Sequence, residues 1–288
     1  MGKVKNYGRS VRDWLLEVAK HSGVPYQMLL IRYMQERLLF RLAQSVYRAH
    51  FILKGGALLY AYTLMKSRPT LDVDFLGLNI GREEHKIRHA FETIANISCQ
   101  EDGVVFDADS ISIKQITINR EYHGVRVQLK ARLDTIVQQV SIDIGFGDVV
   151  TPCAQALAYP QTLPALPQAH VLAYSLENVV AEKFEAMIAL GRDNSRMKDF
   201  FDVYCILQAY NLDEALLQSS IRETFIHRKT QLSTVPALFD AEFALSTSRI
   251  AMWNTFLRKI NYHVPLAFAE VVAYITVKLR PYLPGKES

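Results

Sequence analysis

The chain has 288 residues, of which 50 % are hydrophobic and 22 % charged, and its formal net charge is +4. This composition is that of an ordinary globular protein, long enough for one large or two modest domains. The small excess of basic residues, 33 against 29 acidic, permits an anionic partner but lacks the dense basic stripe of a dedicated nucleic-acid binder.

Cysteine usage and hydropathy exclude two further classes of protein. Cys99, Cys153 and Cys205 are far apart and form no CxxC or Cys/His pattern, so neither a disulfide framework nor a zinc site is expected. No run approaches the roughly 20 apolar residues of a membrane span, and the N-terminus has no signal-peptide stretch. We therefore expect a soluble, cytoplasmic protein with no membrane association.

The first half of the chain alternates between helical and strand patterns. Ser10 can cap a helix that ends near His21, and apolar spacing predicts a second helix over residues 26–47. HFILKGGALLYAYTLM predicts a short strand, a glycine turn and a helix. Further strands are predicted over residues 71–76, 111–119, 124–133 and 137–146, with a helix over 82–95. We expect the fold class α/β (α+β), a mixed sheet with flanking helices followed by a helical C-terminal domain.

A change in composition marks a domain boundary. Pro152, Pro160, Pro164 and Pro167 disfavour regular structure, and only helical patterns follow them. We predict a catalytic domain over residues 1–150, a Pro-rich linker over 151–170 and a helical domain over 171–288.

Two aspartates share one face of the predicted strand in RPTLDVDF. Side chains two apart on a strand lie about 7 Å from each other, so the carboxylates of Asp72 and Asp74 repel unless a cation lies between them. Carboxylate oxygens suit Mg²⁺, and this pair could hold one or two ions against a nucleoside triphosphate. The alternative is a pair of solvated aspartates on an exposed strand.

Lys54, Gly55 and Gly56 lie between a predicted strand and a predicted helix. Backbone N–H groups and the helix dipole at such a turn can hold a phosphate, which glycine allows to approach closely. A plain strand-to-helix turn is the alternative. Arg68 and Thr70, just before the aspartates, are further candidates for nucleotide binding.

Asp143, in VSIDIGFGD, is a third candidate carboxylate. If its strand neighbours the strand of Asp72 and Asp74, Asp143 would complete the metal cluster and could act as general base on an attacking hydroxyl. Asp148 is expected in the following turn.

The helical half places charges where apolar side chains are expected. Lys183 falls in an apolar stripe, and Asp199 and Asp202 group with Val203 at helical spacing. Because such charges are rarely buried unpaired, we expect a buried Lys183–Asp199 pair or a charged cleft floor. A snorkelling lysine and a helix-capping aspartate are the alternative.

Five segments, in the order KGGALLYAY, RPTLDVDF, IDIGFGD, AEKFEAM and RMKDFFDVY, resemble the AbiEii/AbiGii toxin family over residues 50–210. The resemblance implies a nucleotidyltransferase fold. It also implies that Gly55 and Gly56 cradle the nucleotide, that Asp72 and Asp74 bind the metal, and that Lys183, Asp199 and Asp143 belong to the active site.

One departure concerns the glycine turn. The wider superfamily usually has a Gly-Ser turn whose hydroxyl contacts phosphate, whereas Ala57 follows Gly56 here. That contact must then come from backbone N–H groups or Lys54. Family members are toxins of type IV toxin-antitoxin systems, each paired with an antitoxin encoded beside it and active in phage defence.

The expected function is a Mg²⁺-dependent nucleotidyltransferase toxin that transfers NMP from an NTP to an acceptor. RNA, at a tRNA 3′ end, is the expected acceptor, and Arg192, Arg196 and Lys198 could bind its phosphates. The alternatives are a small molecule, as in aminoglycoside nucleotidyltransferases, a protein side chain, or a non-catalytic nucleotide- or protein-binding module. The last is disfavoured because such a module has no need of mutually repelling carboxylates.

Overall fold

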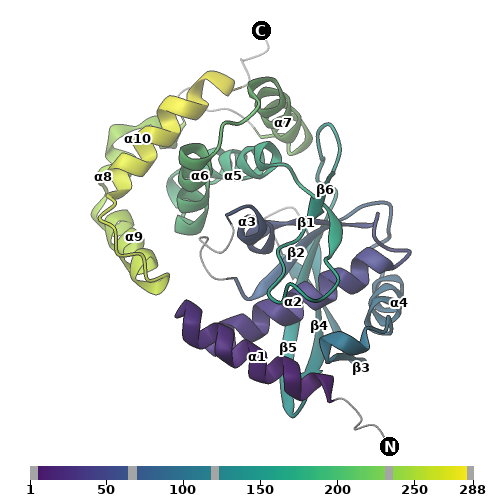
Figure 1. Ribbon diagram of the computed structural model, residues 1–288. Coiled ribbons are helices and arrows are strands. Elements are labelled where there is room, and N and C mark those ends of the chain that lie inside the picture. The colour runs from purple at the N-terminus through teal and green to yellow at the C-terminus, as the bar shows by residue number, and fades with distance from the viewer. Residues whose placement is uncertain (1–5, 64–69, 118–122, 231–235, 284–288) are drawn as a thin grey trace, which may run out of the picture. The chain divides into compact units, whose positions relative to one another are not determined.

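The structure, a computed structural model, describes residues 6–63, 70–117, 123–230 and 236–283 (Figure 1). The chain divides into two compact units. Unit 1 comprises Met1–Gly147 and Gln155–Ala173, and unit 2 comprises Asp148–Ala154 and Tyr174–Ser288. Unit 1 contains a mixed sheet with flanking helices and unit 2 is helical, which confirms the predicted fold class.

Unit 1 is built on one sheet, in which the described strands have the order β3-β4-β5-β2-β1-β7-β6. β2 runs parallel to β5 and β1 parallel to β7, whereas the other neighbouring strands are antiparallel. The elements of unit 1 are α1 (Tyr7–Ser22), α2 (Tyr26–Gln44), β1 (Phe51–Lys54), α3 (Gly55–Thr63), β2 (Asp72–Gly77), α4 (Glu84–Ala95), η1 (Gln100–Asp102), β3 (Val104–Thr117), β4 (His123–Leu133), β5 (Ile136–Phe146), β6 (Gln155–Ala158) and β7 (His170–Ala173).

Alternation along the central strands gives this sheet an apolar face and a polar face. Val73 and Phe75 of β2 and Ile142 of β5 are buried. On the same side, Phe51 contacts both Phe75 and Phe91 of α4, with ring centroids 5.9 Å and 5.2 Å apart. Since successive strand residues point to opposite faces, the aspartates of β2 point away from this apolar layer.

Helix α2 brings charged side chains into the interior of unit 1. Arg37 and Arg41 are buried and donate to Asp102 Oδ2 at 3.1 Å and 2.7 Å. Burial raises the pKa of Glu36, although its hydrogen bond from the Thr162 backbone opposes that effect. A buried carboxylate shared by two guanidiniums fixes η1 against α2, because removing any one partner would leave an uncompensated charge.

The Pro-rich segment differs from the predicted linker. Gln155–Ala158 and His170–Ala173 are strands β6 and β7, which extend the sheet of unit 1 beyond β1. Pro160, Pro164 and Pro167 lie in the loop between these strands, where a missing N–H interrupts no ladder. Residues 155–173 therefore belong to unit 1, and the boundaries at 150 and 170 do not describe a separate linker.

Helix α1 also begins earlier than Ser10 predicted. It starts at Tyr7, and Asn6 Oδ1 accepts a hydrogen bond from Arg9 N at 3.0 Å. Asn is a strong N-cap residue, and its bond satisfies a backbone N–H that the helix itself cannot.

Unit 2 is formed by helices that pack around aromatic side chains. α5 contacts α6 and α7, and α6 contacts α10. Trp253 is fully buried between Phe201 and Phe268. Its elements are α5 (Leu176–Leu190), η2 (Gly191–Asp193), α6 (Met197–Ala209), α7 (Glu214–His227), η3 (Ala237–Phe239), α8 (Ala241–Leu245), α9 (Thr247–Lys259), α10 (Phe268–Leu279) and η4 (Arg280–Tyr282). Across the described residues of both units, we find no helix with the length and apolar character to cross a membrane.

Candidate active site

Four charged side chains form one row across the sheet of unit 1. The register pairs Lys54 of β1 with Asp74 of β2, Asp74 with Asp143 of β5, and Asp143 with Arg126 of β4. Residues paired in this way share one face of a sheet. Asp72 lies on that face too, two residues before Asp74. The row therefore has two central carboxylates with a cation at each end.

Helix α3 begins beside the Asp74 carboxylate. The Gly56 N–H donates to Asp74 Oδ2 at 3.4 Å. Gly55 has a φ of 66°, and a Cβ added there would lie 2.0 Å from Asp74 Oδ2. Glycine is thus required at position 55 both for its conformation and for the close approach of the carboxylate. The positive end of the helix dipole favours the negative charge of Asp74.

Thr70 fills the space beside Gly56. A Cβ at Gly56 would lie 2.7 Å from Thr70 Oγ1, and this hydroxyl donates to the Asp72 backbone carbonyl at 3.1 Å. A hydroxyl group therefore lies next to the turn although the chain has Ala57 after Gly56. Arg68, the other candidate in this stretch, lies outside the described residues.

Asp143 has a partner that the sequence patterns did not predict. Arg126 donates from Nε and Nη2 to the two carboxylate oxygens of Asp143, at 2.7 Å each. The pKa of Arg126 is raised, first by the hydrogen bond to Asp143 and further by the charges of Asp143, Asp72 and Asp74, against the opposing effect of burial. In the sequence, the position of Arg126 between Val125 and Val127, both buried in β4, indicates that its side chain lies on the polar face of the sheet.

The oxygen ligands that this face offers fit Mg²⁺. Asp72 and Asp74 are half-buried, and the glycine turn next to them leaves no room for a side chain. Mg²⁺ is usually held by one or two carboxylates together with substrate phosphates. No group of three or more His, Cys, Asp or Glu able to hold a metal ion occurs in the described part of the chain. Asp143 as a third ligand, and a second ion, therefore remain predictions.

Unit 2 contains a charge cluster of its own around Lys183 of α5. Lys183 Nζ lies 2.5 Å from Asp199 Oδ1 and 3.0 Å from Asp202 Oδ2, with side chains only 14 %, 6 % and 3 % exposed. Burial alone would raise the pKa of Asp199, but Lys183 outweighs it, so that this pKa is lowered. The buried Lys183–Asp199 pair expected from the sequence is present, and Asp202 extends it.

A second buried cation of unit 2 was not expected. Arg228, just after α7, donates to Asp148 at 2.9 Å and to Glu185 at 2.8 Å, and lies 3.4 Å from Glu182. Burial opposes the charge of Arg228, yet the three carboxylates raise its pKa. This cluster ties α5 and α7 to Asp148, so we assign it a structural role.

The basic residues proposed to bind RNA phosphates also lie in unit 2. Arg192 and Lys198 are exposed, and Arg192 pairs with Asp240. Arg249 donates to the Arg192 backbone carbonyl. The charge of Arg192 is therefore partly balanced within the protein.

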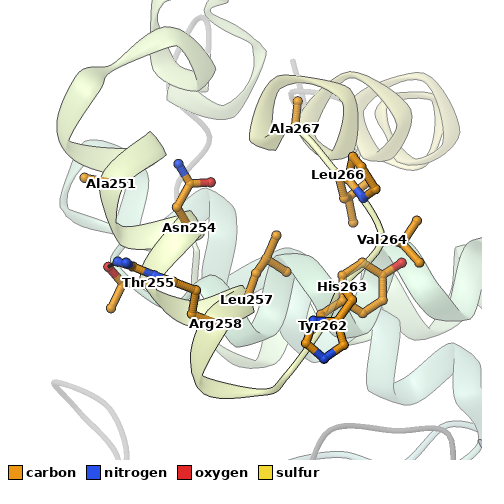
Figure 2. A pocket seen from close by; sticks show the side chains of 11 residues that line it. Ala251, Asn254, Thr255, Leu257, Arg258, Tyr262, His263, Val264, Leu266 and Ala267 are labelled. Atoms are coloured by element: carbon orange, nitrogen blue, oxygen red, sulfur yellow. Dashed lines mark hydrogen bonds between the residues drawn. The ribbon is translucent and has the colours of Figure 1, made fainter.

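A cavity of about 730 Å³ lies between α9 and the segment that leads to α10 (Figure 2). Its polar lining includes Asn254, Arg258 and His263. None of the residues that line it is a carboxylate, so it has no oxygen ligands of the kind that Asp72 and Asp74 provide.

The fold and site together define a nucleotidyltransferase-like protein: paired aspartates on one face of a mixed sheet, a glycine turn that opens a helix, and a helical second unit. The family described as nucleotidyl transferase AbiEii toxin, type IV TA system, matches residues 37–274. The chain therefore belongs to the AbiEii family, as its sequence motifs predicted.

Two solved structures from Helicobacter pylori resemble the chain at low identity. One, described as a candidate nucleotidyltransferase, is 12 % identical with a TM-score of 0.49, over 90 % of this chain and 96 % of that chain. The other, JHP933, is 14 % identical with a TM-score of 0.49, over 89 % and 91 %. A search of the curated proteins gives no match.

Proposed function

We propose that this protein is a Mg²⁺-dependent nucleotidyltransferase toxin that transfers NMP from an NTP to RNA, with a tRNA 3′ end as acceptor. The observation that carries the proposal is the Asp72/Asp74 pair, held on one sheet face beside the Gly55 turn in a chain of the AbiEii family. A cation bound between the two carboxylates would explain why these mutually repelling groups lie beside each other.

In this proposal each residue of unit 1 has a separate task. Asp72 and Asp74 hold the metal, and when bound the metal supplies positive charge at the phosphate oxygens. The N–H groups in the first turn of α3 bind the triphosphate, because the helix cannot satisfy them all itself. Lys54 adds a positive charge at the end of the row, and the Thr70 hydroxyl lies beside the turn.

The reaction is an in-line displacement at the α-phosphate. An RNA hydroxyl forms a bond to the α-phosphorus, the bond to the bridging oxygen of the β-phosphate breaks, and pyrophosphate leaves. The hydroxyl proton passes to a base. Asp143 was the predicted base, but both of its oxygens accept hydrogen bonds from Arg126, so we assign no base.

Family membership supports the remaining parts of the proposal. Lys183 and Asp199 are proposed to be required for transfer, and an antitoxin encoded beside the gene is proposed to neutralise the protein. Action in the cytoplasm, in phage defence, is part of the proposal too, and membership of a toxin family supports it.

The acceptor can be identified directly. The purified protein is incubated with each α-³²P-labelled NTP, Mg²⁺ and total cellular RNA, and the products are separated into RNA, protein and small molecules. We expect label in RNA of tRNA size. Label in protein or small molecules instead would replace the RNA acceptor with one of the alternatives.

A further inference from the structure

The Arg126–Asp143 pair lies at the end of the charged row and has no assigned role. Both oxygens of the Asp143 carboxylate accept a hydrogen bond from the same guanidinium, at 2.7 Å each. Bidentate, charge-assisted contacts of this kind are among the strongest that a carboxylate makes with a side chain. To turn its carboxylate toward a metal ion, Asp143 would have to break this bidentate geometry.

The strand register keeps this pair in place. The side chains of Arg126 and Asp143 are 37 % and 18 % exposed, and the two residues are directly paired across β4 and β5. On its other side Asp143 is paired with Asp74, whose charge would repel Asp143 if Asp143 had no cation of its own. Arg126 removes that repulsion, and as a guanidinium it is charged throughout the physiological range.

We propose that Arg126 is the built-in cation of this site: it neutralises Asp143, keeps Asp143 out of the ligand set, and leaves the metal to Asp72 and Asp74 alone. The inference rests on the proposed function, because it presumes a divalent cation at Asp72 and Asp74. It makes Arg126 a positioning residue. It also replaces the expectation that Asp143 is the third ligand.

Mn²⁺ binding without nucleotide tests this inference with a readout other than activity. Free Mn²⁺ is measured by electron paramagnetic resonance during titration of the full chain. Asp143→Asn should leave the dissociation constant within about twofold of wild type, whereas Asp72→Asn should raise it about tenfold or more. Arg126→Gln should lower it about tenfold, because Asp143 becomes available, and Arg126→Gln/Asp143→Asn should restore the wild-type value.

Arg126→Lys is the conservative control. It keeps a cation beside Asp143 and should bind Mn²⁺ as wild type does, and a thermal melt of each variant checks that it is folded. If Asp143→Asn weakens Mn²⁺ binding as much as Asp72→Asn, Asp143 is a ligand and the inference is wrong. If Arg126→Gln leaves Mn²⁺ binding unchanged and weakens only ATP binding, Arg126 belongs to the triphosphate site and the inference is equally wrong.

Failure of the proposed function has a different signature. If wild type binds no Mn²⁺ either alone or with an added non-hydrolysable NTP analogue, or Asp72→Asn binds it unchanged, the metal site itself is absent, and the inference about Arg126 fails with it. An altered result at Asp143 alone overturns only the role of Arg126.

Discussion

Asp74 is in contact with both the glycine turn and the charged row of the site. It accepts a hydrogen bond from Gly56 and is the cross-strand neighbour of both Lys54 and Asp143. Asp74→Asn keeps the shape of the side chain and an oxygen acceptor but removes a charged metal ligand. We expect transfer to fall about 100-fold or more, with the melting temperature nearly unchanged, as measured by labelled-NTP transfer and a thermal melt.

Gly55 offers a second test at the scale of one residue, with Gly23 as its matched control. Both have left-handed backbone, with φ of 66° and 69°, but an added Cβ meets Asp74 Oδ2 at position 55 and nothing within 4 Å at position 23. Gly23→Ala should lose about 1–2 kcal/mol in free energy of unfolding, and Gly55→Ala should lose more, because its Cβ also overlaps the Asp74 side chain. Only Gly55→Ala should also lose Mn²⁺ binding, because only there is a carboxylate displaced. Equal Mn²⁺ binding by the two variants would contradict this account.

At the scale of elements, Lys183 joins α5 to α6. Lys183→Met fits an apolar stripe, but it would remove the cation that both Asp199 and Asp202 contact. We expect a loss of about 3–5 kcal/mol in free energy of unfolding, measured by urea denaturation. Lys183→Arg retains the cation and should recover most of that stability. If it also lacks transfer activity, the ammonium itself is needed.

The same pair predicts a pH dependence. Burial acts to raise the pKa of Asp199, but the charge and hydrogen bond of Lys183, together with other nearby cations, have the larger effect. The pKa of Asp199 in the folded state is therefore below its ordinary value. A carboxylate whose pKa is lowered by folding stabilises the folded state at any pH above its unfolded-state pKa. This stabilisation is lost as the pH falls through its folded-state pKa. The difference in stability between wild type and Lys183→Met should therefore be largest at neutral pH and shrink below about pH 4. A difference independent of pH would show that the pair is not electrostatic in origin.

Much of this element structure can be read from local pattern. Apolar spacing predicts α2, and strict alternation predicts β2, β4 and β5 to within a residue or two of their observed bounds. The four-residue strands β6 and β7 are not predicted from the sequence, because they are too short to show alternation and are flanked by prolines. Alternation predicts β3 only from Ile111, whereas the strand begins at Val104, and the predicted residues 118–119 lie outside the described residues.

The candidate site is harder to predict because it depends on register between strands. The spacing of Asp72 and Asp74 is visible in the sequence, but the pairing of Asp74 with Asp143 requires β5 to lie beside β2. Arg126 could be related to Asp143 only through the order of β4 and β5. Long-range pairing of this kind is set by the whole sheet and not by any local segment.

At the scale of the whole molecule, an RNA acceptor should make binding depend on the salt concentration. Replacing Arg192 and Arg196 by Ala should raise the apparent KM for RNA and reduce the salt slope by about 0.7 for each phosphate that these side chains no longer neutralise. Asp240→Asn provides an opposite control: it removes the carboxylate that pairs with Arg192 while keeping a side chain that can cap α8. This variant should bind RNA more tightly. An unchanged salt slope in both variants would show that these basic residues are solvated surface residues that do not contact RNA.

The most direct test of the central claim is single-turnover transfer of labelled NMP to RNA, in the presence of Mg²⁺, by wild type and by the Asp72→Asn/Asp74→Asn double variant. Asp107→Asn, which changes an exposed aspartate of β3, is the matched control. We expect wild type and Asp107→Asn to label RNA at the same rate and the double variant to label none while remaining folded. Undiminished labelling by the double variant would contradict the assignment of these two aspartates to the metal and the chemistry.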